Sequence, residues 1–187
     1  MLKSLLATAA TAAMLIGATA TAQAHTKELW MLGGFSHPES VELDIPHQVL
    51  YVSNVGAAPT AKDGNGFISK VSRDGKLLEL KWITGMSAPK GMVIDGFKLY
   101  VSDIDYLVEI DTRTGKIVNR HRASGAIFLN DTALDKDGNV YVSDIATKKI
   151  WQLKDGVFSV WYDKPDMMHP NGLRGIHGGK LLVAGWG

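Results

Sequence analysis

The 187-residue sequence contains no cysteine and almost no excess of charge of either sign. Without cysteine, the chain can form no disulfide scaffold, thiol nucleophile or thiolate metal site. There are 20 Lys and Arg against 19 Asp and Glu, so no basic field can hold a phosphate backbone, and we expect no nucleic-acid partner. Beyond Ala24 no stretch keeps the apolar period of a helix, which disfavours helix-rich and parallel α/β folds.

The N-terminal segment, residues 1–24, has the features of a secretory signal peptide. Lys3 gives a positive start, residues 5–22 are apolar or small and carry no charge, and Ala22-Gln23-Ala24 offers a small-residue cleavage site. The alternative is an uncleaved membrane anchor, but the Ala and Thr content makes this stretch weakly hydrophobic. We therefore expect residues 1–24 to be a signal peptide, and the mature protein to be periplasmic or secreted without a membrane partner.

A strand-like tetrapeptide recurs four times along the chain. The copies are LYVS at 50–53, LYVS at 99–102, VYVS at 140–143 and LLVA at 181–184, so the last two offsets between copies are equal. Each copy follows a short apolar strand, and each of the first three precedes two more candidate strands, with Gly, Asp and Asn supplying most of the turns. Each unit therefore has the pattern of four antiparallel strands, the size of a propeller blade.

This repeat predicts an all-β fold of the β-propeller class. An ordinary β-sandwich is the alternative, but a sandwich has no reason to repeat a near-identical tetrapeptide at a fixed offset. The fourth unit stops at Gly187, directly after its second strand, whereas closed propellers have complete blades. We therefore expect residues 25–187 to form a partial propeller of about three and a half four-stranded blades, the front part of a longer protein.

The candidate functional residues lie where the repeats differ. Just before the first strand of each unit, Glu39, Lys90, Asn130 and Asn171 occupy one register. The innermost strand of every propeller blade faces the central channel, so equivalent positions of successive blades form a ring around the axis. A carboxylate and two amide oxygens are hard ligands. We therefore expect a divalent-cation site made by Glu39, Asn130 and Asn171, for Ca²⁺ first, with Zn²⁺, Mg²⁺ and Mn²⁺ as alternatives.

Three motifs carry a resemblance to a known family: the Glu after Pro at 38–39, the FLND run at 128–131 and the PNGL run at 170–173. In this order and register they are similar to the senescence marker protein and gluconolactonase family, also called regucalcin-like, over roughly residues 30–187. The resemblance implies a six-bladed propeller with one axial divalent cation, commonly Ca²⁺, held by a Glu, one or two Asn and an Asp. Members of the family hydrolyse sugar lactones, and related propellers hydrolyse phosphotriesters or aryl esters.

Carried over by position, the resemblance makes Glu39 the first metal ligand and Asn171 the Asn ligand. Asn130 contacts the metal, the substrate or the metal-bound water, with Asp131 beside it, so Asn130 and Asp131 are the catalytic candidates. The family's final Asp ligand, also its candidate general base, is expected beyond Gly187. With that ligand missing, we expect weak metal binding and little or no turnover for the chain as written.

The sequence thus predicts an exported, divalent-metal-dependent hydrolase of the lactonase or esterase type. A bound cation would polarise a lactone carbonyl and lower the pKa of a coordinated water. The expected partner is a small-molecule substrate such as a lactone, and the full-length protein is expected to be a monomer. The alternative is a non-catalytic, ligand-binding propeller, motivated by Lys90 in the ring. His37 and His169 each precede the Pro of a ring motif, where they either line the channel mouth or bond to a loop.

Overall fold

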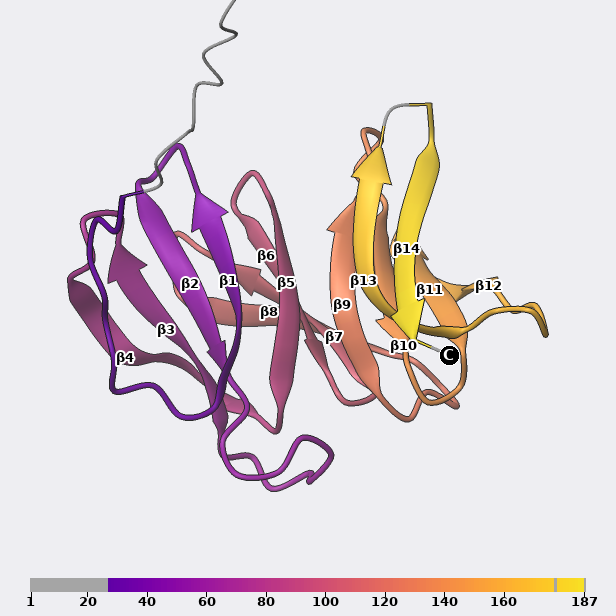
Figure 1. Cartoon of the computed structure of the whole chain (residues 1–187), viewed down its shortest axis with the longest axis horizontal. Coiled ribbons are helices and arrows are strands. Elements are labelled where there is room, and N and C mark those ends of the chain that lie inside the picture. Colours follow the sequence, from indigo (N-terminus) through magenta and orange to yellow (C-terminus); the bar gives the residue numbers. More distant parts are fainter. Residues whose placement is uncertain (1–26, 177, 187) are drawn as a thin grey trace, which may run out of the picture.

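The computed structural model describes residues 27–176 and 178–186, so the predicted signal peptide, residues 1–24, lies outside the described residues. Within them the chain forms fourteen β-strands in four antiparallel sheets (Figure 1). No helix in this part of the chain is long and apolar enough to cross a membrane. The all-β prediction is therefore confirmed.

The sheets follow the chain in order, each strand pairing with its neighbours in sequence. The first sheet contains β1 (Pro38–Asp44), β2 (Val49–Asn54), β3 (Gly66–Ser72) and β4 (Leu77–Met86). The second contains β5 (Pro89–Asp95), β6 (Lys98–Asp103), β7 (Tyr106–Asp111) and β8 (Lys116–Arg122). The third contains β9 (Leu129–Leu134), β10 (Val140–Asp144), β11 (Lys149–Lys154) and β12 (Val157–Tyr162). The fourth contains β13 (His169–Ile176) and β14 (Lys180–Trp186).

The four repeated tetrapeptides all lie in the second strand of a sheet, namely in β2, β6, β10 and β14. Their β-branched and aromatic residues suit the interior of a sheet, because strands β2, β6 and β10 are paired on both edges. In the second and third sheets, the tight turns that join first to second strands contain glycines with positive φ, Gly96 (57°) and Gly138 (82°), whereas in the first sheet Gln48 has positive φ (56°). The predicted four-stranded units are therefore present as three complete sheets followed by a two-stranded one.

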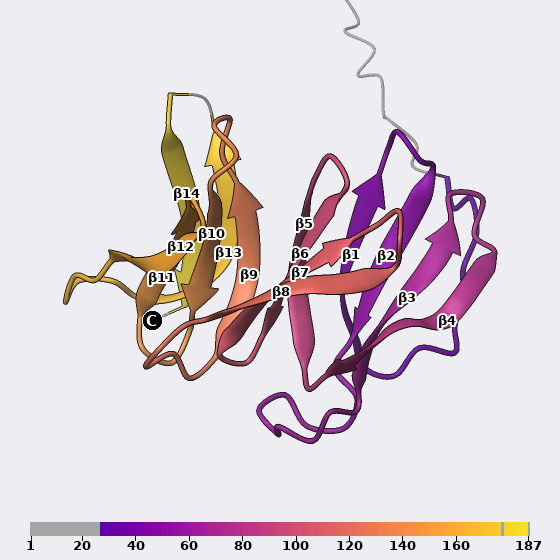
Figure 2. The ribbon, with the colours of Figure 1, turned by 180° about the vertical axis from the view of Figure 1, so that it is seen from behind.

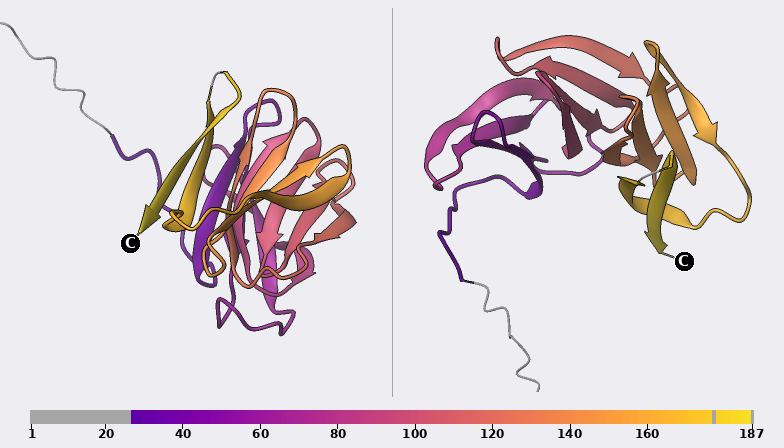
Figure 3. Two further views of the ribbon diagram at one scale, coloured as in Figure 1. Left: turned by 90° about the vertical axis from the view of Figure 1, so that its right-hand side faces the viewer. Right: turned by 90° about the horizontal axis from the view of Figure 1, so that it is seen from above.

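The hydrophobic core lies between the sheets. Seen from above, the sheets follow one another around an arc (Figure 3). One apolar cluster joins the first and second sheets through residues such as Ile68 and Val108, and another joins the second and third through residues such as Leu107 and Val142. A smaller cluster, which includes Leu173, joins the third and fourth. Successive sheets are thus packed face to face, as blades are in a propeller.

The first strands of the four sheets, β1, β5, β9 and β13, contact one another in succession along one side of the arc. We call them the inner strands. The strands at the far edges of the complete sheets, β4, β8 and β12, are best seen from behind (Figure 2). This arrangement brings residues that are distant in the sequence to neighbouring positions on the inner strands, which is what a shared site requires.

Candidate functional site

Each inner strand carries a β-bulge at the register predicted for the site. In every sheet, two residues of the inner strand stand opposite a single residue of the second strand. The four pairs are Glu39-Ser40, Lys90-Gly91, Asn130-Asp131 and Asn171-Gly172, and the residues opposite them are Ser53, Ser102, Ser143 and Ala184. The sequence placed these residues just before the strands, but they lie within them. A bulge re-aims the side chains it contains, so all four sheets present the same pair of positions in one way.

A serine hydroxyl from the second strand fills each of the first three bulges. In the first sheet the backbone N–H of Ser40 donates to Ser53 Oγ at 3.0 Å. In the third sheet the backbone N–H of Asp131 donates to Ser143 Oγ, also at 3.0 Å. In the second sheet Ser102 Oγ lies 3.4 Å from the carbonyl oxygen of Gly91. All three serines are fully buried, so these hydroxyls satisfy backbone groups that the bulge removes from the ladder.

The residue after each serine holds the loop that leads into the inner strand. Asn54 Oδ1 accepts a bond from the backbone N–H of Ser36 at 2.9 Å. Asp103 accepts from the backbone N–H of Ala88 at 2.7 Å, and Asp144 accepts from that of Phe128 at 3.1 Å. The Ser-Asn or Ser-Asp dipeptide of the first three sheets thus anchors both the bulge and the loop that leads into it.

Two of the three predicted metal ligands touch each other. Asn130 Nδ2 donates to Asn171 Oδ1 at 2.5 Å, between two sheets. Asn130 is 7% exposed, whereas Asn171 is exposed. The site is therefore open on the side of Asn171 and closed behind Asn130.

Asp131 bridges the third and fourth sheets beside this pair. Its Oδ2 accepts a hydrogen bond from the backbone N–H of Leu173 at 2.6 Å. The side chain packs against the backbone of Gly91, where an added Cβ would lie 2.7 Å from Oδ1. Burial raises the pKa of Asp131, and the bond from Leu173 opposes this rise. Asp131 is therefore a partly desolvated carboxylate held next to Asn130.

Glu39, the third predicted ligand, is exposed on β1 but lies within electrostatic reach of Asp131 and Lys90. Although the residue as a whole is exposed, partial desolvation of its carboxyl group first, and the Asp131 charge second, raise the pKa of Glu39, while the Lys90 ammonium lowers it. Two neighbouring carboxylates thus each resist ionisation. A cation bound beside them would offset both penalties, and this is the electrostatic environment that favours a metal.

Lys90 occupies the position of the second sheet in this ring and is only 2% exposed. Its Nζ donates to the carbonyl oxygen of Ala88 at 2.8 Å and lies 4.7 Å from the centre of the Phe128 ring. Burial lowers the pKa of Lys90 to about 8, although the Asp103 and Glu39 charges oppose this. The second sheet therefore places an ammonium group within electrostatic reach of Glu39.

The donor set fits a hard cation better than a soft one. Within residues 27–176 and 178–186, no group of three or more His, Cys, Asp or Glu side chains is arranged to hold a metal. The predicted set does not depend on such a group, because in it Asn130 and Asn171 would supply amide oxygens and only Glu39 would supply a carboxylate. Amide and carboxylate oxygens are the ligands that Ca²⁺ and Mg²⁺ take in proteins.

Glu42 was not singled out in the sequence, yet it lies at the same inner strands. Its Oε1 accepts a hydrogen bond from the backbone N–H of Ile94 in the second sheet at 3.1 Å. Burial raises the pKa of Glu42, the bond from Ile94 and the Arg174 charge lower it, and Asp131 raises it further. No motif marks Glu42, because its partner Ile94 is remote in the sequence and on another sheet. After Glu39, it is the second carboxylate within electrostatic reach of Asp131.

The two histidines beside the ring motifs have different surroundings. His37 is exposed and has a φ of 50°, and its carbonyl oxygen accepts a bond from the backbone N–H of Val55 at 3.2 Å. His169 is partly buried, with Nδ1 2.9 Å from the carbonyl oxygen of Ile145. Both contacts are with the loops that follow the second strands. Only that of His169 involves the imidazole ring, so only His169 agrees with the loop-bonding alternative.

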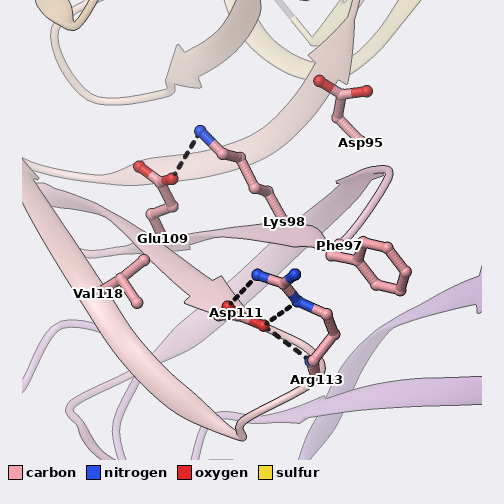
Figure 4. Close-up of a pocket in the computed structure, with 7 residues that line it drawn as sticks. All are labelled: Asp95, Phe97, Lys98, Glu109, Asp111, Arg113 and Val118. Atoms are coloured by element: carbon pink, nitrogen blue, oxygen red, sulfur yellow. Dashed lines mark hydrogen bonds and ion pairs between the residues drawn. The ribbon is translucent and has the colours of Figure 1, made fainter.

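A hollow of about 330 Å³ lies elsewhere, on the second sheet, among Asp95, Phe97, Lys98, Glu109, Asp111, Arg113 and Val118 (Figure 4). Its charges are largely matched within it. Arg113 pairs with Asp111 at 2.8 Å, and Lys98 pairs with Glu109 at 3.1 Å. Because these groups satisfy one another, the hollow presents little unpaired charge to a ligand, and the inner-strand residues are the better candidate site.

Comparison with known proteins supports the fold. No protein-family profile matches the sequence, and no curated protein matches it. Among solved structures, catalytically inactive virginiamycin B lyase from Staphylococcus aureus with quinupristin has a TM-score of 0.62 at 12% identity, over 82% of this chain and 50% of that chain. A structure of the nidogen/laminin complex has a TM-score of 0.58 at 19% identity, over 80% of this chain and 56% of that chain.

This chain has a β-propeller fold. Both neighbours are six-bladed propeller-like proteins, and the chain spans about half of their length. The three complete sheets and the two-stranded sheet are therefore an incomplete array of blades, as the sequence predicted. At such low identity the likeness shows the fold alone.

Proposed function

We propose that Glu39, Asn130 and Asn171 hold a divalent cation, most suitably Ca²⁺, and that the protein is a metal-dependent hydrolase of sugar lactones or related esters. The observation that carries this proposal is the contact between Asn130 and Asn171 beside Asp131, whose carboxylate interacts with that of Glu39. The sequence resemblance to the gluconolactonase family supports the same reaction class.

The chain's own residues would divide the work as follows. Glu39, Asn130 and Asn171 would hold the cation, which supplies Lewis acidity toward a carbonyl oxygen. Asp131 stands beside Asn130, and its raised pKa suits the acceptance of a proton from water. Its bond to the backbone of Leu173 fixes the distance between the third and fourth sheets, so Asp131 also keeps Asn130 and Asn171 together.

Lys90 favours a second function, a propeller that binds a ligand without turnover. A buried ammonium within reach of Glu39 offsets part of the negative charge that a cation needs. Such a site would hold an uncharged or acidic small molecule through Asn171, which is more exposed than Asn130. The two functions differ in their response to metal removal.

The deciding experiment measures hydrolysis of a panel of aldonolactones and aryl esters by the purified full-length protein, which includes the Asp ligand expected beyond Gly187, with and without a chelator. The hydrolase proposal expects turnover that the chelator abolishes and Ca²⁺ restores, and a loss of at least tenfold in Asn171→Ala. Asn119→Ala is the matched control, because Asn119 is an exposed asparagine on β8, an edge strand far from the inner strands. Binding of these compounds with no turnover in any metal would support the ligand-binding propeller instead.

Export is part of the same proposal. Cleavage after Ala24 would release the chain into the periplasm or the medium, where it would act as a monomer on a small-molecule substrate. N-terminal sequencing of the protein recovered from each fraction tests the cleavage site, and gel filtration tests the monomer. An uncleaved N-terminus in the membrane fraction would support the anchor alternative.

A further inference from the structure

The serines that fill the bulges also reach the neighbouring sheet. Ser143 Oγ accepts from the backbone N–H of Asp131 and donates to the carbonyl oxygen of Asn171 at 2.8 Å. Ser102 Oγ likewise donates to the carbonyl oxygen of Asn130. The spacing from Ser102 to Ser143 in the sequence equals that from Asn130 to Asn171, so the contact is part of the repeat.

These bonds act on the site residues through their backbones. A carbonyl oxygen that is held from the adjacent second strand fixes the position of its own Cα, and hence the origin of its side chain. Asn130 is held by Ser102 of the second sheet, and Asn171 is held by Ser143 of the third. The contact between the two amide groups therefore depends on hydroxyls that never touch it.

We propose that Ser102 and Ser143 are positioning residues of the inner-strand site, each tying a bulge of its own sheet to the asparagine of the next sheet. The proposal rests on the proposed function, because it assigns these serines a role in the cation site. Removal of a group that hydrogen-bonds to a metal ligand, without touching the metal itself, typically lowers metal affinity by 10- to 100-fold.

The fourth sheet lacks the device. Ala184 stands at the serine position, opposite Asn171 and Gly172. Its Cβ is 3.6 Å from where a Cβ on Gly172 would lie, so a hydroxyl at this position would face the bulge. The repeat thus offers two opposite variants. Ser143→Ala removes a hydroxyl group, and Ala184→Ser adds one at the position where the other sheets have it.

The test is calorimetric titration of Ca²⁺ into the wild type, Ser143→Ala, Ala184→Ser and Ser69→Ala. Ser69 is the matched control, because it is equally buried but bonds to Leu80 and Asn54 rather than to an inner strand. We expect affinity at least tenfold lower in Ser143→Ala, severalfold higher in Ala184→Ser and unchanged in Ser69→Ala. Equal affinity in the wild type and Ser143→Ala would overturn the proposal. If Ser143→Ala does not fold, titration of Ser102→Ala decides, because Ser102 holds the carbonyl oxygen of Asn130 in the same way. A tenfold loss there supports the proposal, and unchanged affinity overturns it.

A second readout separates this proposal from the proposed function. Exchange of the Asn130 side-chain amide protons, followed by NMR without metal, reports the bond to Asn171 directly. If the wild type binds no cation, the proposed function fails, but exchange still decides the positioning role. Exchange about tenfold faster in Ser143→Ala than in Ser69→Ala supports it, and equal exchange in the two variants overturns it.

Discussion

Lys90 is the clearest case of a residue whose surroundings do not favour the stability of the fold. Its side chain is buried, and its Nζ contacts one backbone carbonyl and one aromatic face. Burial of a charged amine in such surroundings opposes folding, and it lowers the pKa of Lys90 from 10.5 to about 8. A residue that opposes folding at the site register supports the view that the ring of inner strands is functional.

A pH dependence of stability follows from Lys90. Its folded-state pKa is below its unfolded value, so between pH 8 and 10.5 the unfolded chain binds more protons than the folded one. The free energy of unfolding should therefore gain about 3 kcal/mol from this residue as the pH rises through that window. Urea unfolding at several pH values measures the gain. It should vanish in Lys90→Met and persist in Lys154→Met, an exposed control; equal slopes in both variants would contradict the assignment.

At the scale of the strand, the Ser-Asn or Ser-Asp pair of the first three sheets holds the loop that leads into the inner strand. Asp144 is fully buried and accepts bonds from the backbone N–H groups of Ile127 and Phe128 and from the hydroxyl of Thr147. Removal of its carboxylate would leave these donors unpaired in the interior, at a cost of about 1–3 kcal/mol each where no water replaces it.

Asp144→Ala should accordingly lower the free energy of unfolding by about 3 kcal/mol, allowing for partial rehydration of the loop. Asp163→Ala is the control, because Asp163 is exposed and forms a surface ion pair with Lys149 at 2.9 Å. A change below about 0.5 kcal/mol is expected there. If both variants unfold at the same urea concentration, the anchoring role of Asp144 is wrong.

Gly91 allows two inner strands to approach closely. A Cβ at this position would lie 2.6 Å from the Cα of Asp131 and 2.7 Å from the carbonyl oxygen of Asn130, and neither backbone atom can move without moving β9. Gly91→Ala should cost about 1–3 kcal/mol of stability and weaken cation binding, because it pushes Asn130 out of place. Thermal unfolding and calorimetry test both effects. Gly33→Ala, which meets nothing within 4 Å, should change neither.

The sequence predicted the strands and the register of the site, but not the bulges that present it. The tetrapeptides identify β2, β6, β10 and β14, because apolar repeats at a fixed offset depend only on local sequence. Whether two residues form a bulge depends on which residue of the partner strand stands opposite them, and the sequence does not show this. The sequence therefore predicts that Asn130 and Asp131 lie just before a strand, whereas they are part of it. The bond from Ile94 to Glu42 was equally hidden, because it depends on how two sheets pack.

In the whole molecule, stability and the candidate site lie in different places. The interfaces between sheets stabilise the fold, and the inner strands carry the site residues. Apolar clusters between successive sheets supply the burial that stabilises the array, and they leave the inner strands free to carry charged and amide groups. Each sheet contributes one inner-strand position to the ring. A substitution at one of these positions therefore changes the chemistry of the site without changing the core. Glu39, Lys90, Asn130 and Asn171 differ while the strands behind them repeat.

The central claim is that Glu39, Asn130 and Asn171 form one cation site, and Glu39→Gln tests it most directly. Partial desolvation of its carboxyl group and the Asp131 charge raise the pKa of Glu39, so the ionised side chain is less favourable in the folded chain than in the unfolded one and opposes folding at pH 7. Calorimetry with Ca²⁺ and thermal unfolding without it, both at pH 7, should show that Glu39→Gln binds Ca²⁺ at least tenfold more weakly than the wild type but unfolds at a higher temperature. Equal Ca²⁺ binding by the two proteins, with no rise in the unfolding temperature, would contradict the account.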